Sequence, residues 1–411
     1  MSSERVIYCR DVSERERIRN RTANGLLLKI YGNKEAGGYN RRDKYGNYMY
    51  CNERTDCRIA IEEFLCTDIL DYVKRKDPRF SGKVHGVGSC FAGVSVLSNE
   101  ADLLFMLDIE GVLVEDKERP GYAKYRISDQ CLENWKDCVT DDGYLMSKKL
   151  SAMFYHYVDD ALKSGLHRKL PLLETRFLPT VCLSGLGTIA TTLTVTYNNS
   201  VIIDVDLVLA INCKGLPSLA NATWLQGNAE WPNSEIVSKI KASGYQLVSK
   251  EPFPLTDEEQ TTIWRISFSL AETMLIQDLD TRIGFSTKLC YGLVKFFNLC
   301  FLAPRARDKT PLMKSYYLKI IWLYECQKYP DEMAWASEKL AERFLSIYQQ
   351  VYNMLEEEKL PDFFMPSVNI MTYKISGIVK NEIRNLLDDP VKTFEDWLYD
   401  GKYSLFDNRL V

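Results

Sequence analysis

The sequence predicts an α+β protein of two lobes, in which a mixed β-sheet core precedes a mostly helical C-terminal lobe. The chain has 411 residues, which exceeds the size at which one hydrophobic core stops growing. Strand-like runs gather between residues 100 and 211, and apolar residues at helical spacing dominate further along. We therefore expect a partly ordered leader (1–50), a core (51–215), a connecting segment (216–254) and a helical lobe (255–411).

The first candidate site lies at the start of a predicted strand. Glu100 and Asp102 are two residues apart, so a strand projects both carboxylates from one face. Like charges repel unless a cation lies between them, and such acidic pairs suit Mg²⁺ bound together with substrate phosphates. Upstream, the Gly88-Ser89 turn offers backbone N–H groups and a hydroxyl to a phosphate. Together these features indicate nucleotidyl transfer with two metal ions; each alone also fits an ordinary turn or a solvated strand entry.

A third carboxylate follows about a hundred residues later. Residues 188–211 have the pattern of a β-hairpin, with an alternating run at Thr191–Tyr197, a turn at Asn198-Asn199 and a second strand at Val201–Ile211. Asp206 lies inside the apolar second strand, where an unpaired buried charge is costly, and Asp204 shares its face. One of these two aspartates is expected to complete a metal-binding triad with the upstream pair.

The remaining elements follow from periodicity and from residues that end helices. Apolar spacing predicts a helix over residues 51–76 that stops before Asp77-Pro78. We also expect a strand at Tyr122–Ile127, a helix at Leu145–Leu162 and a loop-rich passage after Ile211. Further along, we expect a helix that begins at Thr310-Pro311 and ends near Pro330, and a long helix through Leu340–Leu355.

The order of these motifs resembles the nucleotidyltransferase core of the cyclic GMP-AMP synthase-like receptors, within the male-abnormal (Mab) nucleotidyltransferase fold. The resemblance spans about Arg58 to Pro366 and rests on Gly88-Ser89, Glu100-x-Asp102, Asp206, Trp264–Glu272, Ser315–Lys319 and Leu360–Pro366. It implies a two-lobed nucleotidyltransferase fold in which the helix before Asp77 is a spine that joins the lobes.

The resemblance also implies an activity. Glu100, Asp102 and Asp206 would hold two Mg²⁺ or Mn²⁺ ions and join ATP, GTP or other NTPs into a cyclic dinucleotide, in a ligand-activated innate immune sensor. The same resemblance implies nucleotide contacts at Gly88, Ser89, Arg265, Lys295, Ser315 and Tyr316. A planar ring stacks on a base and a cation holds phosphate; core packing beside Tyr317 is the alternative for Tyr316.

Two other classes of function remain open at this level. Relatives of this fold include catalytically silent adaptors that bind nucleotides or partners, and the complete acidic triad favours an enzyme instead. A nucleotidyltransferase that extends an RNA end would need the same carboxylates. The triad is also compatible with a linear product.

Cysteine usage and hydropathy bear on cofactors and location. The 12 cysteines are scattered, and no short-spaced Cys and His cluster suits a structural zinc ion, which the vertebrate synthase uses to bind DNA. No apolar run approaches the roughly 20 residues of a membrane span, and the amino terminus lacks an apolar signal core. We expect a cytoplasmic protein with reduced thiols, no structural zinc and no membrane partner.

The formal net charge of −4 argues against a uniformly positive surface. One local basic run could still bind phosphates, and it consists of Arg305, Arg307, Lys309 and Lys314. We expect this run to bind an activating ligand, with double-stranded RNA favoured because its recognition depends on backbone shape and phosphate contacts. An ordinary solvated loop is the alternative.

Overall fold

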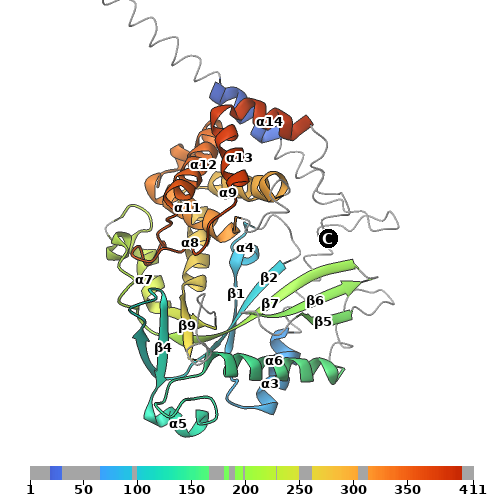
Figure 1. Cartoon of the computed structure of the whole chain (residues 1–411), viewed down its shortest axis with the longest axis vertical. Coiled ribbons are helices and arrows are strands. Elements are labelled where there is room, and N and C mark those ends of the chain that lie inside the picture. Colours follow the sequence, from blue (N-terminus) through green and yellow to red (C-terminus); the bar gives the residue numbers. More distant parts are fainter. Residues whose placement is uncertain are drawn as a thin grey trace, which may run out of the picture. The chain divides into compact units, whose positions relative to one another are not determined.

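The chain, as a computed structural model, divides into two compact units. The sheet unit comprises Cys51–Gln277 with Phe364–Val368, and the helical unit comprises Met1–Tyr50, Asp278–Phe363 and Asn369–Val411. Figure 1 shows the elements of both units. The structure describes residues 19–29, 65–94, 100–165, 180–184, 190–197, 200–227, 229–249, 262–303 and 313–399.

The sheet unit is built on one mixed β-sheet, which has nine strands in the described residues. The main path runs β1-β2-β7-β8-β9-β4-β3, and β6 pairs with both β5 and β7. The strands are β1 (Lys83–Val87), β2 (Glu100–Leu107), β3 (Gly111–Glu115), β4 (Tyr122–Ile127), β5 (Thr180–Ser184), β6 (Thr191–Tyr197), β7 (Ser200–Cys213), β8 (Tyr245–Val248) and β9 (Ile263–Ser267). Only β2 and β7 pair in parallel; the other pairs among these strands are antiparallel. The predicted α+β class with a mixed sheet is confirmed.

Helices cover this sheet and connect its strands. They are η1 (Leu65–Ile69), α3 (Leu70–Lys76), α4 (Gly88–Phe91), α5 (Asp129–Trp135), α6 (Ser147–Lys163), η3 (Thr223–Gln226), α7 (Ser234–Ser243) and α8 (Ser269–Arg282), the last of which crosses into the helical unit. Helices α3 and α6 contact each other and lie beside the sheet (Figure 1).

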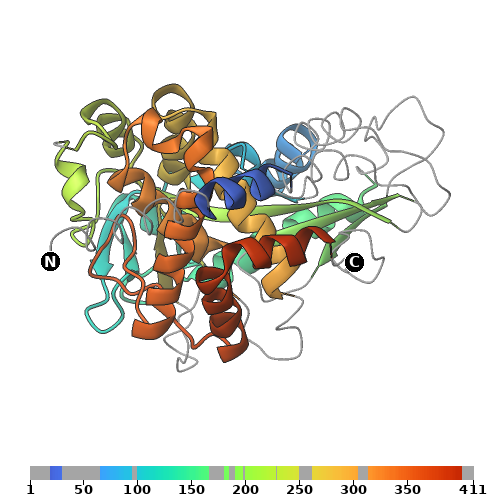
Figure 2. The ribbon, with the colours of Figure 1, turned by 90° about the horizontal axis from the view of Figure 1, so that it is seen from above.

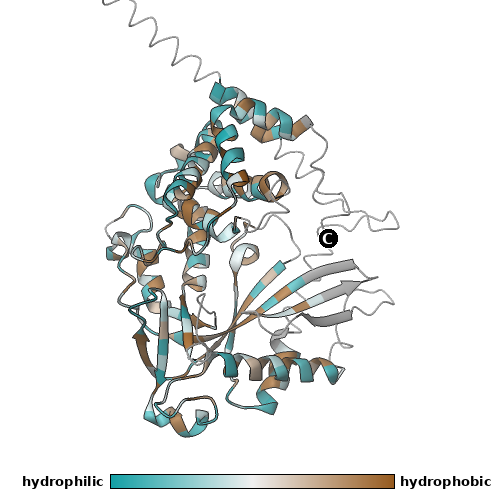
Figure 3. Cartoon of the chain, in the orientation of Figure 1, coloured by the Kyte–Doolittle hydropathy of each residue, from teal (hydrophilic) through white to brown (hydrophobic). Residues whose placement is uncertain are grey.

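One face of β2 is buried against α6. Phe105 of β2 stacks on Phe154 of α6 with ring centroids 5.2 Å apart, and Ala101 and Leu103 on the same face are buried. Side chains alternate along a strand, so Glu100 and the other even-numbered residues of β2 project from the opposite face. Figure 3 shows hydrophilic positions among the hydrophobic ones along β2 and the coloured part of β7.

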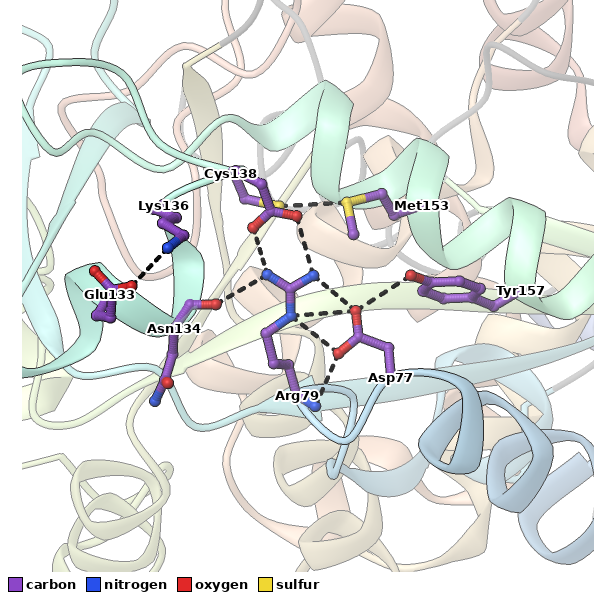
Figure 4. Close-up of polar contacts among 9 residues, drawn as sticks. Asp77, Arg79, Glu133, Asn134, Lys136, Cys138, Met153 and Tyr157 are labelled. Carbon is purple, nitrogen blue, oxygen red and sulfur yellow. Dashed lines mark hydrogen bonds and ion pairs between the residues drawn. The ribbon is translucent and has the colours of Figure 1, made fainter.

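An ion-pair network holds the end of α3 against α5 and α6 (Figure 4). The Arg79 guanidinium pairs with Asp77 at 2.7 Å and with Asp137 at 2.5 Å, and its carbon lies 4.8 Å from the centre of the Trp135 ring. The Tyr157 hydroxyl also donates to Asp77. Burial alone would raise the pKa of Asp77, but the Arg79 hydrogen bonds outweigh it and hold that pKa below its usual value.

Replacing Arg79 should therefore destabilise the sheet unit. In Arg79→Met, two carboxylates lose their shared cation, so we expect a loss of about 2 kcal/mol or more at pH 7. Because the folded pKa of Asp77 is depressed, its contribution exists above the unfolded pKa of about 3.9 and disappears as the pH falls through the folded pKa. The difference between wild type and variant in urea unfolding should thus shrink below about pH 4.

Lys136→Met is the matched control for this prediction. Lys136 pairs with Glu133 in the same region, but both side chains are largely exposed, at 71% and 83%. Exposed pairs contribute little to stability, because solvent screens the two charges. Equal losses in the two variants, or a pH-independent loss in Arg79→Met, would contradict the assignment.

The helical unit surrounds an apolar core. Its elements are a helix over residues 19–29, α9 (Phe285–Phe297), η5 (Asn298–Leu302), α11 (Ser315–Lys328), η6 (Glu332–Trp335), η7 (Ser337–Lys339), α12 (Leu340–Glu357), α13 (Gly377–Asp388) and α14 (Pro390–Tyr399). Helix α12 contacts α9, α11 and α13, and Figure 2 shows these orange and red helices gathered together. A buried pair of Arg343 and Glu325, 2.9 Å apart, ties α12 to α11.

Several predicted elements are confirmed, and their ends differ slightly. The predicted strand Tyr122–Ile127 is β4 with the same bounds, and the helix predicted at Leu145–Leu162 is α6. The helix before Asp77 ends there as expected, although its earlier residues lie outside the described part of the chain. The helix predicted from Thr310-Pro311 starts later, at Ser315.

The expected connecting segment, residues 216–254, differs from the prediction. It contributes α7 and the fully buried strand β8, which pairs between β7 and β9 inside the sheet. The boundary between the units instead follows Gln277. Proline and glycine residues around α7 give the sequence a loop-like texture, while β8 is only four residues long and too short to show a period.

The leader holds a helix in its described part, residues 19–29, and this helix belongs to the helical unit. The Arg19 guanidinium donates to the carbonyl oxygens of Leu387 and Asp388 at the end of α13. In the described residues, no helix is long and apolar enough to cross a membrane. Free thiols are present at Cys90, Cys131, Cys138, Cys213, Cys290, Cys300 and Cys326.

Candidate functional site

The parallel pairing of β2 with β7 brings four carboxylates together. Glu100 lies opposite Asp204, and Asp102 lies opposite Asp206. Directly paired residues of neighbouring strands project from the same face, so all four acids share the face turned away from α6. The predicted triad of Glu100, Asp102 and Asp206 is thus gathered on one surface, and Asp204 joins it.

Strand β6 adds two threonines to this face. Thr194 lies opposite Asp204 and Thr192 opposite Asp206, so each carboxylate of β7 has a hydroxyl beside it. The Thr192 hydroxyl donates to Oδ1 of Asp206 at 2.5 Å, and the Thr194 hydroxyl donates to Oδ1 of Asp204 at 2.6 Å. Sequence reasoning missed both threonines as site residues, although the run from Thr191 to Tyr197 already places them on one face of a strand.

These side chains line a pocket of about 230 Å³. The lining residues are Glu100, Ala101, Asp102, Thr192, Thr194, Asp204 and Asp206. Glu100 is exposed and the other three acids are partly exposed, so solvent reaches the carboxylates. The arrangement leaves room for a ligand of opposite charge.

The donor chemistry of this pocket fits Mg²⁺ or Mn²⁺, which prefer carboxylate oxygens. The acids form two cross-strand pairs. Within the described residues, no three or more His, Cys, Asp or Glu side chains are placed so that they could hold one metal ion together. Ions of this kind usually keep several waters and bind through one or two carboxylates together with substrate phosphates. A carboxylate pair per ion meets that requirement.

Gly88 is required by the position of Asp102. It begins α4 with φ of 75°, and a Cβ atom placed on it would lie 1.9 Å from Oδ2 of Asp102. Such an approach is far inside van der Waals contact, so only glycine leaves that carboxylate where it is. The predicted phosphate contact by Gly88 and Ser89 remains a prediction; the structure adds that Gly88 makes room for the acid.

The other predicted nucleotide-binding residues are spread over both units. Arg265 is partly exposed and lies in β9, opposite Tyr122 of β4 and Val248 of β8 in the sheet register. It is not among the residues that line the pocket. Lys295, Ser315 and Tyr316 belong to the helical unit.

Within the helical unit, the predicted stacking residue Tyr316 is half-buried on α11. Its hydroxyl donates to Oδ2 of Asp362 at 3.4 Å, and Nζ of Lys319 lies 4.8 Å from its ring centre. Lys295 is half-buried on α9. In the basic run, Lys314 is exposed beside Tyr373, while Arg305, Arg307 and Lys309 lie outside the described residues.

A mixed sheet with paired carboxylates at its parallel strands, joined to a helical unit, is the organisation of a nucleotidyltransferase-type protein. Comparison with protein families agrees with this class. A sequence model of the Mab-21 protein nucleotidyltransferase domain matches residues 95–278, and one of the Mab-21 protein HhH/H2TH-like domain matches residues 286–389. The chain belongs to the Mab-21 nucleotidyltransferase domain family.

Curated relatives share most of its length. Protein mab-21-like of Drosophila melanogaster is 27% identical over 351 residues, which is 80% of this chain and 88% of the relative. Protein mab-21-like of Aedes aegypti is 26% identical over 343 residues, which is 81% of this chain and 85% of the relative. The similarity thus extends over both units.

Proposed function

We propose that this protein is a metal-dependent nucleotidyltransferase that makes a cyclic dinucleotide from NTPs. The observation that carries the proposal is the in-register pairing of Glu100 and Asp102 with Asp204 and Asp206, which lines one pocket with four carboxylates. A catalytically silent adaptor would have no use for four solvent-reachable acids side by side, because like charges directly opposite each other destabilise a sheet. The family match supports nucleotidyl transfer in general.

In this proposal, different residues of the chain bind the metal ions, contact the triphosphate and orient the nucleotides. Glu100, Asp102 and Asp206 hold the ions, and Gly88 with Ser89 approaches the triphosphate of the donor nucleotide. When bound there, the divalent ions would activate the attacking ribose hydroxyl and neutralise charge on the triphosphate and the departing pyrophosphate. The chain's remaining contribution is to orient both nucleotides, for which Arg265, Lys295, Ser315 and Tyr316 are the candidates.

The product is tested by incubating the full chain with the four NTPs and Mg²⁺ or Mn²⁺, followed by mass analysis. A cyclic dinucleotide supports the proposal, and a linear dinucleotide would retain transfer but exclude ring closure. Lengthening of a labelled RNA would assign the RNA-end reaction instead. No product under any condition would favour the adaptor.

Activation belongs to the same proposal. We propose a cytosolic, ligand-activated immune sensor in which double-stranded RNA binds the basic run that ends at Lys314. The exposed side chain of Lys314, in the helical unit, supports this proposal. The nucleic-acid panel in the product assay therefore includes double-stranded RNA at several salt concentrations. Phosphate-driven activation should fade as salt rises.

Tyr316 gives a prediction about nucleotide binding. If its ring stacks on a base, Tyr316→Ala should weaken apparent NTP affinity by about 1 to 3 kcal/mol, whereas Tyr316→Phe keeps the ring and should stay near wild type. The hydroxyl that Phe lacks donates to Oδ2 of Asp362 over a long 3.4 Å. The measurement is KM for each NTP. Equal damage by Phe and Ala would assign the role to the hydroxyl or to packing.

A further inference from the structure

Two rows of side chains cross the three strands β2, β7 and β6. One row is Glu100, Asp204 and Thr194, and the other is Asp102, Asp206 and Thr192. Each row ends in a threonine whose hydroxyl donates to Oδ1 of the aspartate beside it. The repetition of the same acid, acid, threonine order in both rows needs a physical explanation.

We propose that Thr192 and Thr194 are positioning residues for the carboxylates of β7, a proposal that rests on the metal-dependent function above. Each hydroxyl holds one oxygen, Oδ1, of its aspartate. Within the described part of the chain, the second oxygen, Oδ2, of Asp204 and of Asp206 has no hydrogen-bond partner. Each aspartate is thereby held with one oxygen engaged and one oxygen left for a cation.

The chemistry of the two side chains suits this role. The terminal torsion of an aspartate is broad, so a carboxylate on a strand turns easily unless a partner fixes it. Threonine is β-branched and stiff at χ1, so its hydroxyl is already oriented by the strand. A hydrogen bond to an ionised carboxylate is short and about twice as strong as one between neutral groups. Partners behind metal ligands typically change metal affinity by about 10 to 100-fold when they are removed.

A β-bulge is what brings these partners together. Near the turn, Tyr197 pairs with Ser200 and Thr196 with Val201, and the register then shifts by one residue between Val195 and Thr196. Without that shift, Leu193 would lie opposite Asp204. Bulges commonly re-aim side chains next to active sites, and here the bulge sets a hydroxyl against each β7 carboxylate.

The test is Mn²⁺ binding to the full chain, measured from the electron paramagnetic resonance signal of free Mn²⁺. Thr192→Val and Thr194→Val remove a hydroxyl at nearly constant shape, while Thr192→Ser and Thr194→Ser keep it. We expect the valine variants to bind Mn²⁺ about 10 to 100-fold more weakly and the serine variants to stay close to wild type. Thr191→Val, on the buried opposite face of β6, is the matched control and should leave binding unchanged.

Each outcome has a distinct meaning. Valine variants that bind Mn²⁺ as tightly as wild type, or serine variants as weak as valine, would overturn the positioning role. If both valine variants fail to fold, as judged by thermal unfolding without metal, the hydroxyls serve folding and the proposal is wrong. If wild type itself binds no Mn²⁺, the proposed metal-dependent function fails. If wild type binds Mn²⁺ and the valine variants bind it equally well, only the positioning role fails.

Discussion

Asp206→Asn is expected to abolish nucleotidyl transfer while leaving the fold intact. The amide has the shape of the carboxylate and can still accept the hydrogen bond that Thr192 donates to Oδ1. What it lacks is the negative charge that a divalent cation requires. Catalytic metals supply several kcal/mol of transition-state stabilisation, so we expect pyrophosphate release from NTPs to fall by about a thousandfold or more.

Asp108→Asn is the control for this charge change. Asp108 directly follows β2 and is exposed, and its Oδ1 accepts a 3.0 Å hydrogen bond from Nδ2 of Asn212, which an amide oxygen can also accept. Its activity should match wild type. A folded Asp206→Asn protein with activity within about tenfold of wild type would remove Asp206 from the site, and Asp204→Asn would then be the decisive variant.

Gly88→Ala is expected to cost both activity and stability. At φ of 75° an alanine is strained by about 1 to 2 kcal/mol. Its Cβ would also lie 1.9 Å from Oδ2 of Asp102, so that carboxylate has to move. A displaced Asp102 no longer lies in line with Asp206, and we expect activity to fall by on the order of a hundredfold, in keeping with the sensitivity of catalysis to 1 Å displacements.

Gly215→Ala separates the two effects. Gly215 has nearly the same backbone conformation, with φ of 77°, but a Cβ there meets nothing within 4 Å. It should therefore show a similar loss of unfolding free energy with unchanged turnover. Equal activities of the two folded variants would show that Asp102 does not depend on the space left by Gly88.

Much of the fold follows directly from periodicity in the sequence. The start of strand β2 and the hairpin of β6 and β7 alternate apolar and polar residues, and α12 repeats apolar residues at three and four positions, so each was predictable. Strand β8 was not, because four buried residues after a helix show no alternation. Its place between β7 and β9 depends on long-range pairing that no local pattern records.

The site was predictable to a similar extent. Alternation places Glu100 with Asp102 and Asp204 with Asp206, but only the register of β2 against β7 sets the two pairs side by side. The contact of each threonine with its aspartate depends on the bulge beside Thr196, since counting from the hairpin turn gives the wrong partner. The space that Gly88 leaves for Asp102 likewise appears only in three dimensions.

The central claim is that the carboxylate face holds divalent metal together with a nucleotide triphosphate. Its most direct test is an anomalous difference map from crystals of the full chain grown with Mn²⁺ and a non-hydrolysable NTP. We expect manganese density at coordination distance, about 2.1 to 2.3 Å, from Asp206 and from Asp102 or Glu100, with the triphosphate on the same ion. Manganese that binds elsewhere, or a nucleotide bound with no metal at these carboxylates, would contradict the claim.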